Sequence, residues 1–349
     1  MAGRHSQRRH ILQKKKGMNV KGKQLLRRPA FFCDLINGGL FQGRQRICPA
    51  MLQGMPEVLG FSRRGPGKTE INLERIPDVI YAAGTEEDYL LLLDENQTQT
   101  DYTMPLRNLV DTALSYMQQK EKIEKLHLER KDLKTGSEYL SGFTKQDRLH
   151  PVICVTFYHG ETPWDGGTSL HDILQFPEGY EDMRELCPDF PMNLIHAWNV
   201  RPEQFKTGLG TVFELLPFAA DKGRLQTYIR NHAEHFGNLT AEECDLLEVF
   251  IGMENLGEEG REGYRNREGG YNMCTALLEI REEGLQEGRN EGDWLKLISQ
   301  VQRKMRKGKP LISIAEELEE EEQVIGPIYV LVKAHPEFTR EAVYRQLEI

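Results

Sequence analysis

Apolar residues recur every three or four positions between residues 104 and 130, which is the spacing of an amphipathic helix. Pro105 would lie in its first turn, where a residue without an amide proton costs no hydrogen bond. Two shorter runs, residues 75–83 and 88–97, are rich in β-forming residues and are separated by four residues that begin with Gly84. This arrangement predicts a β-hairpin with a four-residue loop.

Further along the chain, strands and helices are predicted to alternate. Residues 151–158 form the continuous apolar run of a buried strand, and residues 193–200 predict another. Residues 203–256 have helical spacing. The stretch 54–69 is rich in Gly, Pro and Arg and predicts a loop. Strands separated by helices predict an α/β fold, in which helices pack on a sheet.

The C-terminal part of the chain has its own pattern. Glu-Gly recurs with a period of four at positions 283, 287 and 291, which puts three glycines on one face of a predicted helix. Such a face suits close packing on a second copy of the chain, so we expect a homo-oligomer through this region; a solvated linker helix fits the pattern equally. Residues 294–332 predict two amphipathic helices around residues 308–310, an outline that many helical hairpins share without binding DNA.

The composition predicts a folded protein outside the membrane. Of the 349 residues, 39% are hydrophobic and 28% charged, which is too apolar for a disordered chain. No apolar stretch approaches the roughly 20 residues of a membrane span, and the start lacks the apolar core of a secretory signal. The six cysteines are scattered without a C-x-x-C pair, which indicates reduced thiols and a cytoplasmic location.

Positive charge is concentrated at the start. Residues 1–28 contain ten Lys or Arg and no acidic residue, so subtracting them from the formal net charge of −9 leaves −19 on the remainder. Such a leader is typical of a disordered tail that contacts DNA phosphates without sequence preference; an upstream start codon or a solvated tail without a partner fits as well. The DNA-binding candidates in the leader are Lys14, Lys15, Lys16, Arg27 and Arg28.

The predicted hairpin carries the residues with the most chemistry. With its strands paired outward from the loop, Asp78 lies opposite Leu93, and Glu95 is its diagonal neighbour on the same face. A period of two puts Gln97 on that face too. Two carboxylates on adjacent strands can supply oxygen ligands to Mg²⁺, which would polarise a phosphate and activate a water. A slip of one residue in register would exchange Glu95 for Asp94 and turn Gln97 away.

The residues around the hairpin resemble a known family. The core of the Rpn family of recombination-promoting nucleases and transposases, part of the PD-(D/E)XK nuclease superfamily, is similar to Leu-Leu-Leu-Asp-Glu-Asn-Gln-Thr at 91–98 and Asp-Tyr-Thr-Met-Pro-Leu-Arg at 101–107. Further similar segments are residues 31–37, 76–79, 157–160, 163–166, 273–274 and 307–319. The resemblance therefore spans roughly residues 30 to 330.

The resemblance implies a domain organisation. Residues 29–257 would form an α/β, restriction-endonuclease-like core, in which helices flank a mixed sheet. Residues 1–28 would be the basic tail. A Gly- and Glu-rich helical linker at residues 258–293 would lead to a small helical C-terminal region at residues 294–349.

Carried over residue by residue, the resemblance also implies a site. Asp78 and Glu95 would hold Mg²⁺, with Mn²⁺ or Ca²⁺ as substitutes, and Asp34 would be an additional acid. Gln97 stands where most of the superfamily has Lys and would orient the attacking water. Because Gln carries no positive charge, that charge must come from elsewhere, and Arg107 is the candidate. The implied function is metal-dependent hydrolysis of DNA phosphodiester bonds in recombination or transposition.

A rival interpretation keeps the fold without the catalysis. A nuclease-like protein that binds DNA or associates with itself is favoured by the missing Lys and by the acidic body. Two other sites are excluded. The Gly-Lys-Thr sequence at 67–69 ends like a phosphate-binding loop, but Ser62 stands where that motif requires Gly. His232, His235 and Cys244 lack a fourth zinc ligand.

Overall fold

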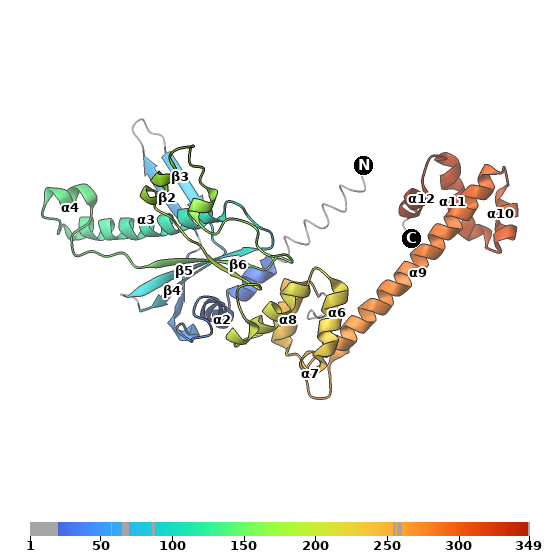
Figure 1. Cartoon of the computed structure of the whole chain (residues 1–349), viewed down its shortest axis with the longest axis horizontal. Helices are drawn as coiled ribbons and strands as arrows, with labels where there is room; N and C mark the ends of the chain where they lie inside the picture. The colour runs from blue at the N-terminus through green and yellow to red at the C-terminus, as the bar shows by residue number, and fades with distance from the viewer. Residues whose placement is uncertain are drawn as a thin grey trace. The chain divides into compact units, whose positions relative to one another are not determined.

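The computed structural model describes residues 20–56, 58–64, 70–85, 88–253, 256 and 260–347, without the side chains of 61–64, 70–74 and 277–289. Contacts divide the chain into two compact units, Met1–Cys274 (unit 1) and Thr275–Ile349 (unit 2), each drawn in Figure 1. The sequence instead predicted boundaries after residues 257 and 293. One continuous helix, α9 (Met273–Arg306), runs through the second of these predicted boundaries.

Unit 1 is built on a five-stranded mixed sheet in the order β1-β4-β5-β6-β7. β4 is antiparallel to both β1 and β5, whereas β5, β6 and β7 run parallel. The strands are β1 (Leu52–Gly54), β4 (Val79–Gly84), β5 (Tyr89–Gln97), β6 (Val152–Tyr158) and β7 (Asn193–His196). The predicted α/β class, a mixed sheet flanked by helices, is confirmed.

Two helices cover opposite faces of this sheet, as Figure 1 shows. On one face, α3 (Met104–Arg130) packs over the apolar side chains of β4, β5 and β6, and its bounds match the predicted helix. On the other face lies α2 (Pro29–Gly39), whose Phe32 ring contacts Tyr81 at 4.8 Å between centroids. The side chains on the α3 face are Ile80, Ala82, Leu91, Leu93 and Cys154.

The strand predicted over residues 75–83 is two separate elements. Arg75 ends β3 (Glu70–Arg75), and β4 begins four residues later. Pro77 lies between them, and its missing amide proton interrupts a ladder of hydrogen bonds. The break allows Arg75 to belong to a different sheet from β4.

That second sheet was not predicted. β3 pairs antiparallel with β2 (Leu59–Arg64), so the loop prediction for 54–69 was wrong over residues 59–64. Leu59 is buried in the cluster beneath α3, which gives the strand a tertiary anchor that its Gly- and Arg-rich sequence does not reveal. Residues 65–69, with the Gly-Lys-Thr sequence, lie outside the described residues.

The last third of the basic leader is folded. Residues 20–26 are helical, and Leu25 and Leu26 are buried, so the prediction that the whole of 1–28 is a disordered tail was wrong over its last third. The burial of two adjacent leucines explains why this part of the leader packs on the rest of unit 1. Lys14, Lys15 and Lys16 lie outside the described residues.

The remaining elements of unit 1 are mainly short helices. The predicted helical stretch 203–256 is confirmed as α5 (Leu209–Leu215), α6 (Lys222–Asn231), α7 (Ala233–Phe236) and α8 (Ala241–Ile251), and α4 (Gly136–Ser141) follows α3. β7 is shorter than the predicted 193–200. Its end is set by Asn199, whose side chain accepts from the amide of His196 and donates to the carbonyl of Leu194, closing a turn.

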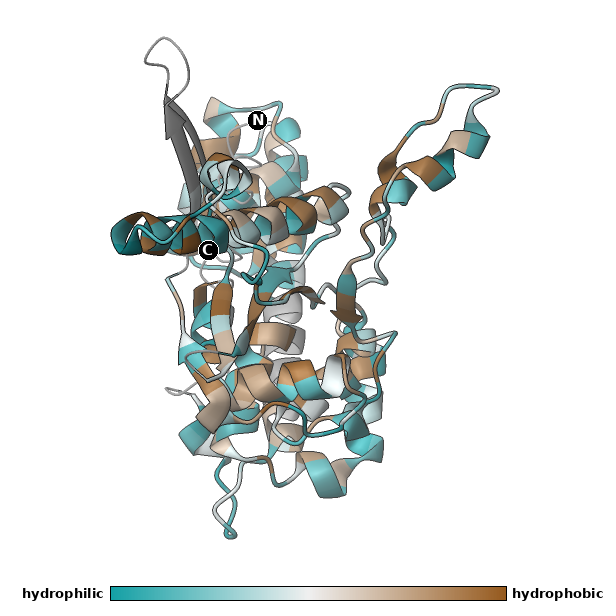
Figure 2. Ribbon diagram, turned by 90° about the vertical axis from the view of Figure 1, so that its left-hand side faces the viewer, coloured by the Kyte–Doolittle hydropathy of each residue, from teal (hydrophilic) through white to brown (hydrophobic). Residues whose placement is uncertain are grey.

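Unit 2 has a hydrophobic core of its own. Its helices are α9, α10 (Leu311–Leu318), α11 (Glu322–Ala334) and α12 (Arg340–Gln346). The core residues include Ile298, Val301, Ile314, Ile325, Ile328 and Val343. Figure 2 shows hydrophobic and hydrophilic residues alternating along the helices of the molecule, as amphipathic helices require. None of the helices in the described ranges combines the length and apolar character needed to span a membrane.

Candidate active site

The hairpin predicted to carry the site is formed by β4 and β5, paired two residues away from the predicted register. Val79 lies opposite Asp94 rather than opposite residue 92. Because strand side chains alternate with a period of two, a shift of two leaves every side chain on its predicted face. Glu95 and Gln97 therefore share the face covered by α3, whereas Asp94 and Asn96 share the other.

Asp78 occupies the bend just before β4. Its amide donates to the carbonyl of Asp94 at 3.0 Å, and its Oδ2 accepts from the amide of Asn96 at 2.9 Å. Its Oδ1 pairs with the ammonium of Lys23 from the helical part of the leader. These bonds fix Asp78 at the carboxyl end of β5, where its charge acts on Glu95.

Glu95 is held between two arginines from different elements. Its side chain is only 2% exposed. Oε1 accepts from Nη2 of Arg75 at 3.2 Å, and Oε2 accepts from Nη2 of Arg107 at 2.8 Å. Arg75 comes from the end of β3 and Arg107 from the first turn of α3, so the two-stranded sheet and the helix both converge on the carboxyl end of β5.

Arg107 also pairs with Asp101, to which its Nη1 donates at 2.8 Å. Its buried Nε has no hydrogen-bond partner among the described residues. Arg107, the predicted source of positive charge, therefore does contact Glu95, and its Nε donor is unused among the described residues.

Asp111 is a fourth member of this group that the sequence analysis missed. It is fully buried and accepts from Arg75 through both oxygens, at 2.9 Å from Nε and 3.3 Å from Nη2. Its carboxyl group also lies within hydrogen-bonding reach of Glu95. A signal for it exists in the sequence: it follows Arg107 by four positions on the same predicted helix.

The electrostatics of this cluster are unusual for carboxylates. Burial raises the pKa of Glu95 to about 7; the positive charge of Arg107 opposes this rise, and the negative charges of Asp78 and Asp111 add to it. On the opposite face, burial and the charges of Asp78 and Glu95 raise the pKa of Asp94 well above its usual value. Asp94 Oδ2 accepts from the side-chain Nδ2 of Asn96 at 3.0 Å, and its Oδ1 has no partner among the described residues.

Gln97 ends β5 beside the same site. It is half-buried, and its carbonyl accepts from the amide of His159, the residue that follows β6. His159 is buried against Phe250, and burial lowers the pKa of its imidazole to about 4. His159 is therefore neutral near pH 7 and supplies no positive charge to replace a lysine at position 97.

Asp34 has a different environment. Its two oxygens accept from the amides of Lys206 and Thr207 at 2.8 to 3.0 Å and from the Thr207 hydroxyl at 2.6 Å. These bonds tie α2 to the segment that precedes α5. The lone pairs expected to face a metal are engaged with the backbone instead.

Two of the predicted DNA-binding residues of the leader, Arg27 and Arg28, contact aromatic residues of unit 1. The guanidinium of Arg28 stacks over the Phe31 ring at 5.8 Å, and the carbonyl of Arg27 accepts from the Tyr81 hydroxyl. These contacts anchor the junction between the leader and α2.

Carboxylate oxygens, the ligand type that hard divalent cations prefer, are the main acceptors of the cluster. Four carboxylates are buried here, and three cations pair with all of them except Asp94, which has no cationic partner among the described residues. The members are Asp78, Asp94, Glu95 and Asp111, with Lys23, Arg75 and Arg107. Among the described residues, no group of three or more His, Cys, Asp or Glu side chains is arranged to hold a metal ion. A cation bound by Asp78 and Glu95 would take water or phosphate as its other ligands.

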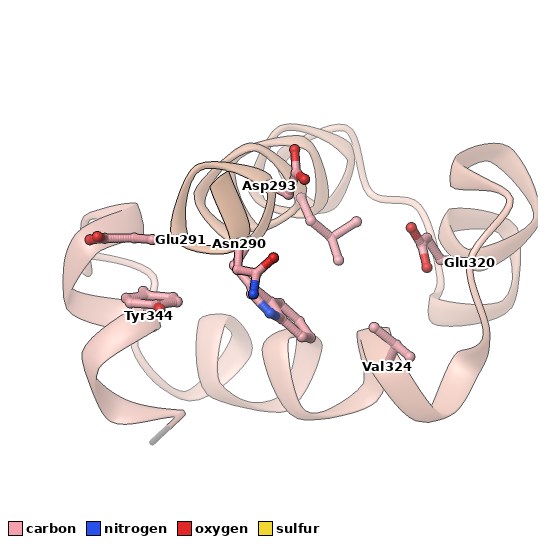
Figure 3. Close-up of a pocket in the computed structure, with 8 residues that line it drawn as sticks. Asn290, Glu291, Asp293, Glu320, Val324 and Tyr344 are labelled. Carbon is pink, nitrogen blue, oxygen red and sulfur yellow. The ribbon is translucent and has the colours of Figure 1, made fainter. Parts of the chain in front are cut away.

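Unit 2 contains a separate hollow of about 640 Å³, shown in Figure 3. Glu291, Asp293 and Glu320 stand around it, and Trp294 and Tyr344 also line it. Negative charge of this kind repels phosphate.

The basic residues of unit 2 are also neutralised in part. Lys304 and Lys309 both pair with Glu317. These two ion pairs neutralise part of the positive charge of the helical hairpin of unit 2.

Comparisons of the chain with protein-family models, with curated proteins and with solved structures found no match.

Proposed function

We propose that this protein is a metal-dependent DNA endonuclease, which hydrolyses phosphodiester bonds in recombination or transposition. The observation that supports the proposal best is the convergence of Asp78, Glu95 and Arg107 at the carboxyl end of β5. Ligand sites of open α/β sheets form at the carboxyl ends of the strands. Carboxylates with strongly raised pKa values cluster at functional sites. The mixed sheet with helices on both faces is the architecture that the resemblance to the PD-(D/E)XK superfamily implies.

The residues of the cluster would divide the work. Asp78 and Glu95 would hold Mg²⁺, with Mn²⁺ or Ca²⁺ as substitutes, and the ion would polarise the scissile phosphate and lower the pKa of a bound water. Gln97 would orient that water through its amide. Arg107, whose Nε has no partner among the described residues, would supply the positive charge that a lysine at position 97 would have given.

Protonation links this proposal to pH. Only the ionised carboxylate of Glu95 is a good ligand for Mg²⁺, and its pKa is raised to about 7. At low Mg²⁺ concentrations the metal-dependent activity should therefore increase as the pH rises through 7, and more Mg²⁺ should move this increase to lower pH because the ion competes with the proton. A group with an ordinary carboxyl pKa would already be ionised well below that range.

A non-catalytic function remains the second candidate, and one observation favours it. Both oxygens of Glu95 are already engaged by Arg75 and Arg107, so the ion-pair network is closed without a metal. Under this alternative the protein binds DNA or associates with itself, and the cluster stabilises the fold.

Plasmid cleavage distinguishes the two functions. Supercoiled plasmid is incubated with the purified chain in Mg²⁺, Mn²⁺ or EDTA, beside Glu95→Gln and Asp78→Asn. These two changes remove charge but keep the size and a hydrogen-bonding oxygen of each side chain. Glu129→Gln, at an exposed acid of α3, is the matched control. Metal-dependent nicking that is lost in the two site variants and kept in the control supports the nuclease. Folded protein that never nicks, or two site variants that nick like wild type, would refute it.

A further inference from the structure

Two buried polar residues of α2 lie one helical turn apart and organise the loops at its end. Asn37 is fully buried; its Oδ1 accepts from the amides of Arg46 and Ile47 at 2.9 and 3.0 Å, and its Nδ2 donates to the Ile47 carbonyl at 2.7 Å. Asp34, 4% exposed, holds the backbone of residues 206–207 by the four bonds described above. Each residue thus fixes one loop.

The two loops form the walls of a hollow of about 590 Å³. They approach closely at Gly43, whose φ of 84° lies in the left-handed region. A Cβ atom there would lie 3.1 Å from the carbonyl oxygen of Gln204. The residues that line the hollow are Gln42, Gly43, Arg44, Arg201, Glu203, Gln204 and Lys206.

The hollow carries an excess of positive charge. Arg44, Arg201 and Lys206 line it, against one acid, Glu203. Within the described part of the chain, none of these three cations forms an ion pair, and Arg44 uses only its Nε, which donates to the Phe41 carbonyl at 3.1 Å. This contrasts with the arginines of the candidate active site, which are paired with carboxylates. The cationic groups here remain free for an external anion.

We propose that this hollow binds phosphate groups of a DNA backbone. Arginine forks and a lysine ammonium are the side chains that bind phosphate most often, and glutamines add neutral donors. Because Asp34 and Asn37 hold both walls through buried hydrogen bonds, the cations project from a pre-formed frame. The phosphate chemistry follows from the hollow itself; the choice of DNA as its source rests on the proposed nuclease function.

The test is DNA binding without turnover. Fluorescence anisotropy of a labelled duplex is measured in EDTA at several salt concentrations for the full chain and for Arg44→Gln, Arg201→Gln and Lys206→Gln. The slope of log K against log salt is negative, and each lost phosphate contact should make it shallower by about 0.9. A tenfold change in salt, from 1 M to 0.1 M, should therefore raise the affinity of a variant about eightfold less than that of the wild type. The matched controls are Arg230→Gln and Lys222→Gln on α6, both at exposed positions.

The outcomes separate this inference from the proposed catalysis. Weaker binding in the three variants, with unchanged melting temperature and unchanged controls, supports the phosphate site even if the chain never cleaves DNA. Variants that bind like wild type, or a wild type that binds no DNA, would overturn it even if cleavage is found. Calorimetry with inorganic phosphate and a mononucleotide distinguishes the source. Tight binding of either small anion, with DNA binding unaffected by the variants, would assign the hollow to a small phosphate ligand and overturn the DNA site.

Discussion

Replacing Asp111 by Asn tests whether the buried cluster stabilises unit 1. Asp111 is fully buried and holds Arg75 through two hydrogen bonds. Hydrogen bonds to charged groups contribute about 1.5–3 kcal/mol, and breaking a buried ion pair costs about 3–5 kcal/mol. The Arg75 side chain is 28% exposed, so water can partly solvate it after the change. We therefore expect the free energy of unfolding to fall by about 2–3 kcal/mol, measured by urea denaturation followed by circular dichroism.

The same variant should change the titration of Glu95. Asp111 raises the pKa of Glu95 through its charge and through a hydrogen bond, so Asp111→Asn should lower that pKa from about 7 towards its ordinary value. Carboxyl-carbon NMR across a pH titration measures it directly.

Asp101→Asn is the internal control for this prediction. It removes a partner of Arg107 from a pair in which both side chains are 28% exposed, and such a pair is worth less than about 1 kcal/mol. If Asp111→Asn lowered the free energy of unfolding no more than Asp101→Asn does, Asp111 would not stabilise the cluster. If the pKa of Glu95 did not change in Asp111→Asn, the charge of Asp111 would not act on Glu95.

Three further predictions concern pH and backbone strain. Because the pKa of Glu95 is raised, the folded chain keeps a proton between pH 4.5 and 7 that the unfolded chain has released. The free energy of unfolding of the wild type should therefore fall by about 3 kcal/mol over this range relative to that of Glu95→Gln. Urea denaturation at each pH measures the difference. Bonds to Asp132 and Asp147 raise the pKa of His127, so their stabilisation is complete below pH 6.5 and is lost as the pH rises through the folded value. His127→Gln should therefore remove the pH dependence of the hydrogen-exchange protection factors in the connector after α3, which are corrected for the intrinsic effect of pH on exchange, and an unchanged dependence would contradict this. Gly43→Ala should cost at least about 1 kcal/mol in the same denaturation assay because Ala disfavours positive φ; a neutral effect would contradict the close approach of the two loops.

Elements set by local pattern could be predicted from the sequence, whereas those set by distant contacts could not. The 104–130 helix follows from its apolar spacing alone, and the structure has the same bounds. β2 was not predicted because its sequence contains Gly60 and a pair of arginines, which are more typical of a loop. Its pairing with β3 and the burial of Leu59 are tertiary features that a local pattern does not show. The break at Pro77 was visible in the sequence, but its effect, a second sheet, was not.

The candidate site shows the same division. Period two placed Glu95 and Gln97 on one face of β5, and this prediction does not depend on how β5 pairs with β4. The error in register was an even number, so the faces of β4 also stay matched to those of β5 as predicted. Arg75 reaches Glu95 only because the chain turns between β3 and β4. The partners of Asp34 lie 172 and 173 positions away, so no local pattern could show that its oxygens are engaged with backbone amides.

Gln97 and the raised pKa of Glu95 are connected. A lysine at position 97 would add a positive charge on the face that Glu95 occupies, and a nearby positive charge lowers the pKa of a carboxyl group. Gln adds no such charge, and the pKa of Glu95 is raised to about 7. Under the proposed function, a divalent cation would compete with the proton for the Glu95 carboxylate. Metal affinity and the pH dependence of cleavage would then be two measurements of one property, and both should change together when Asp111 is neutralised.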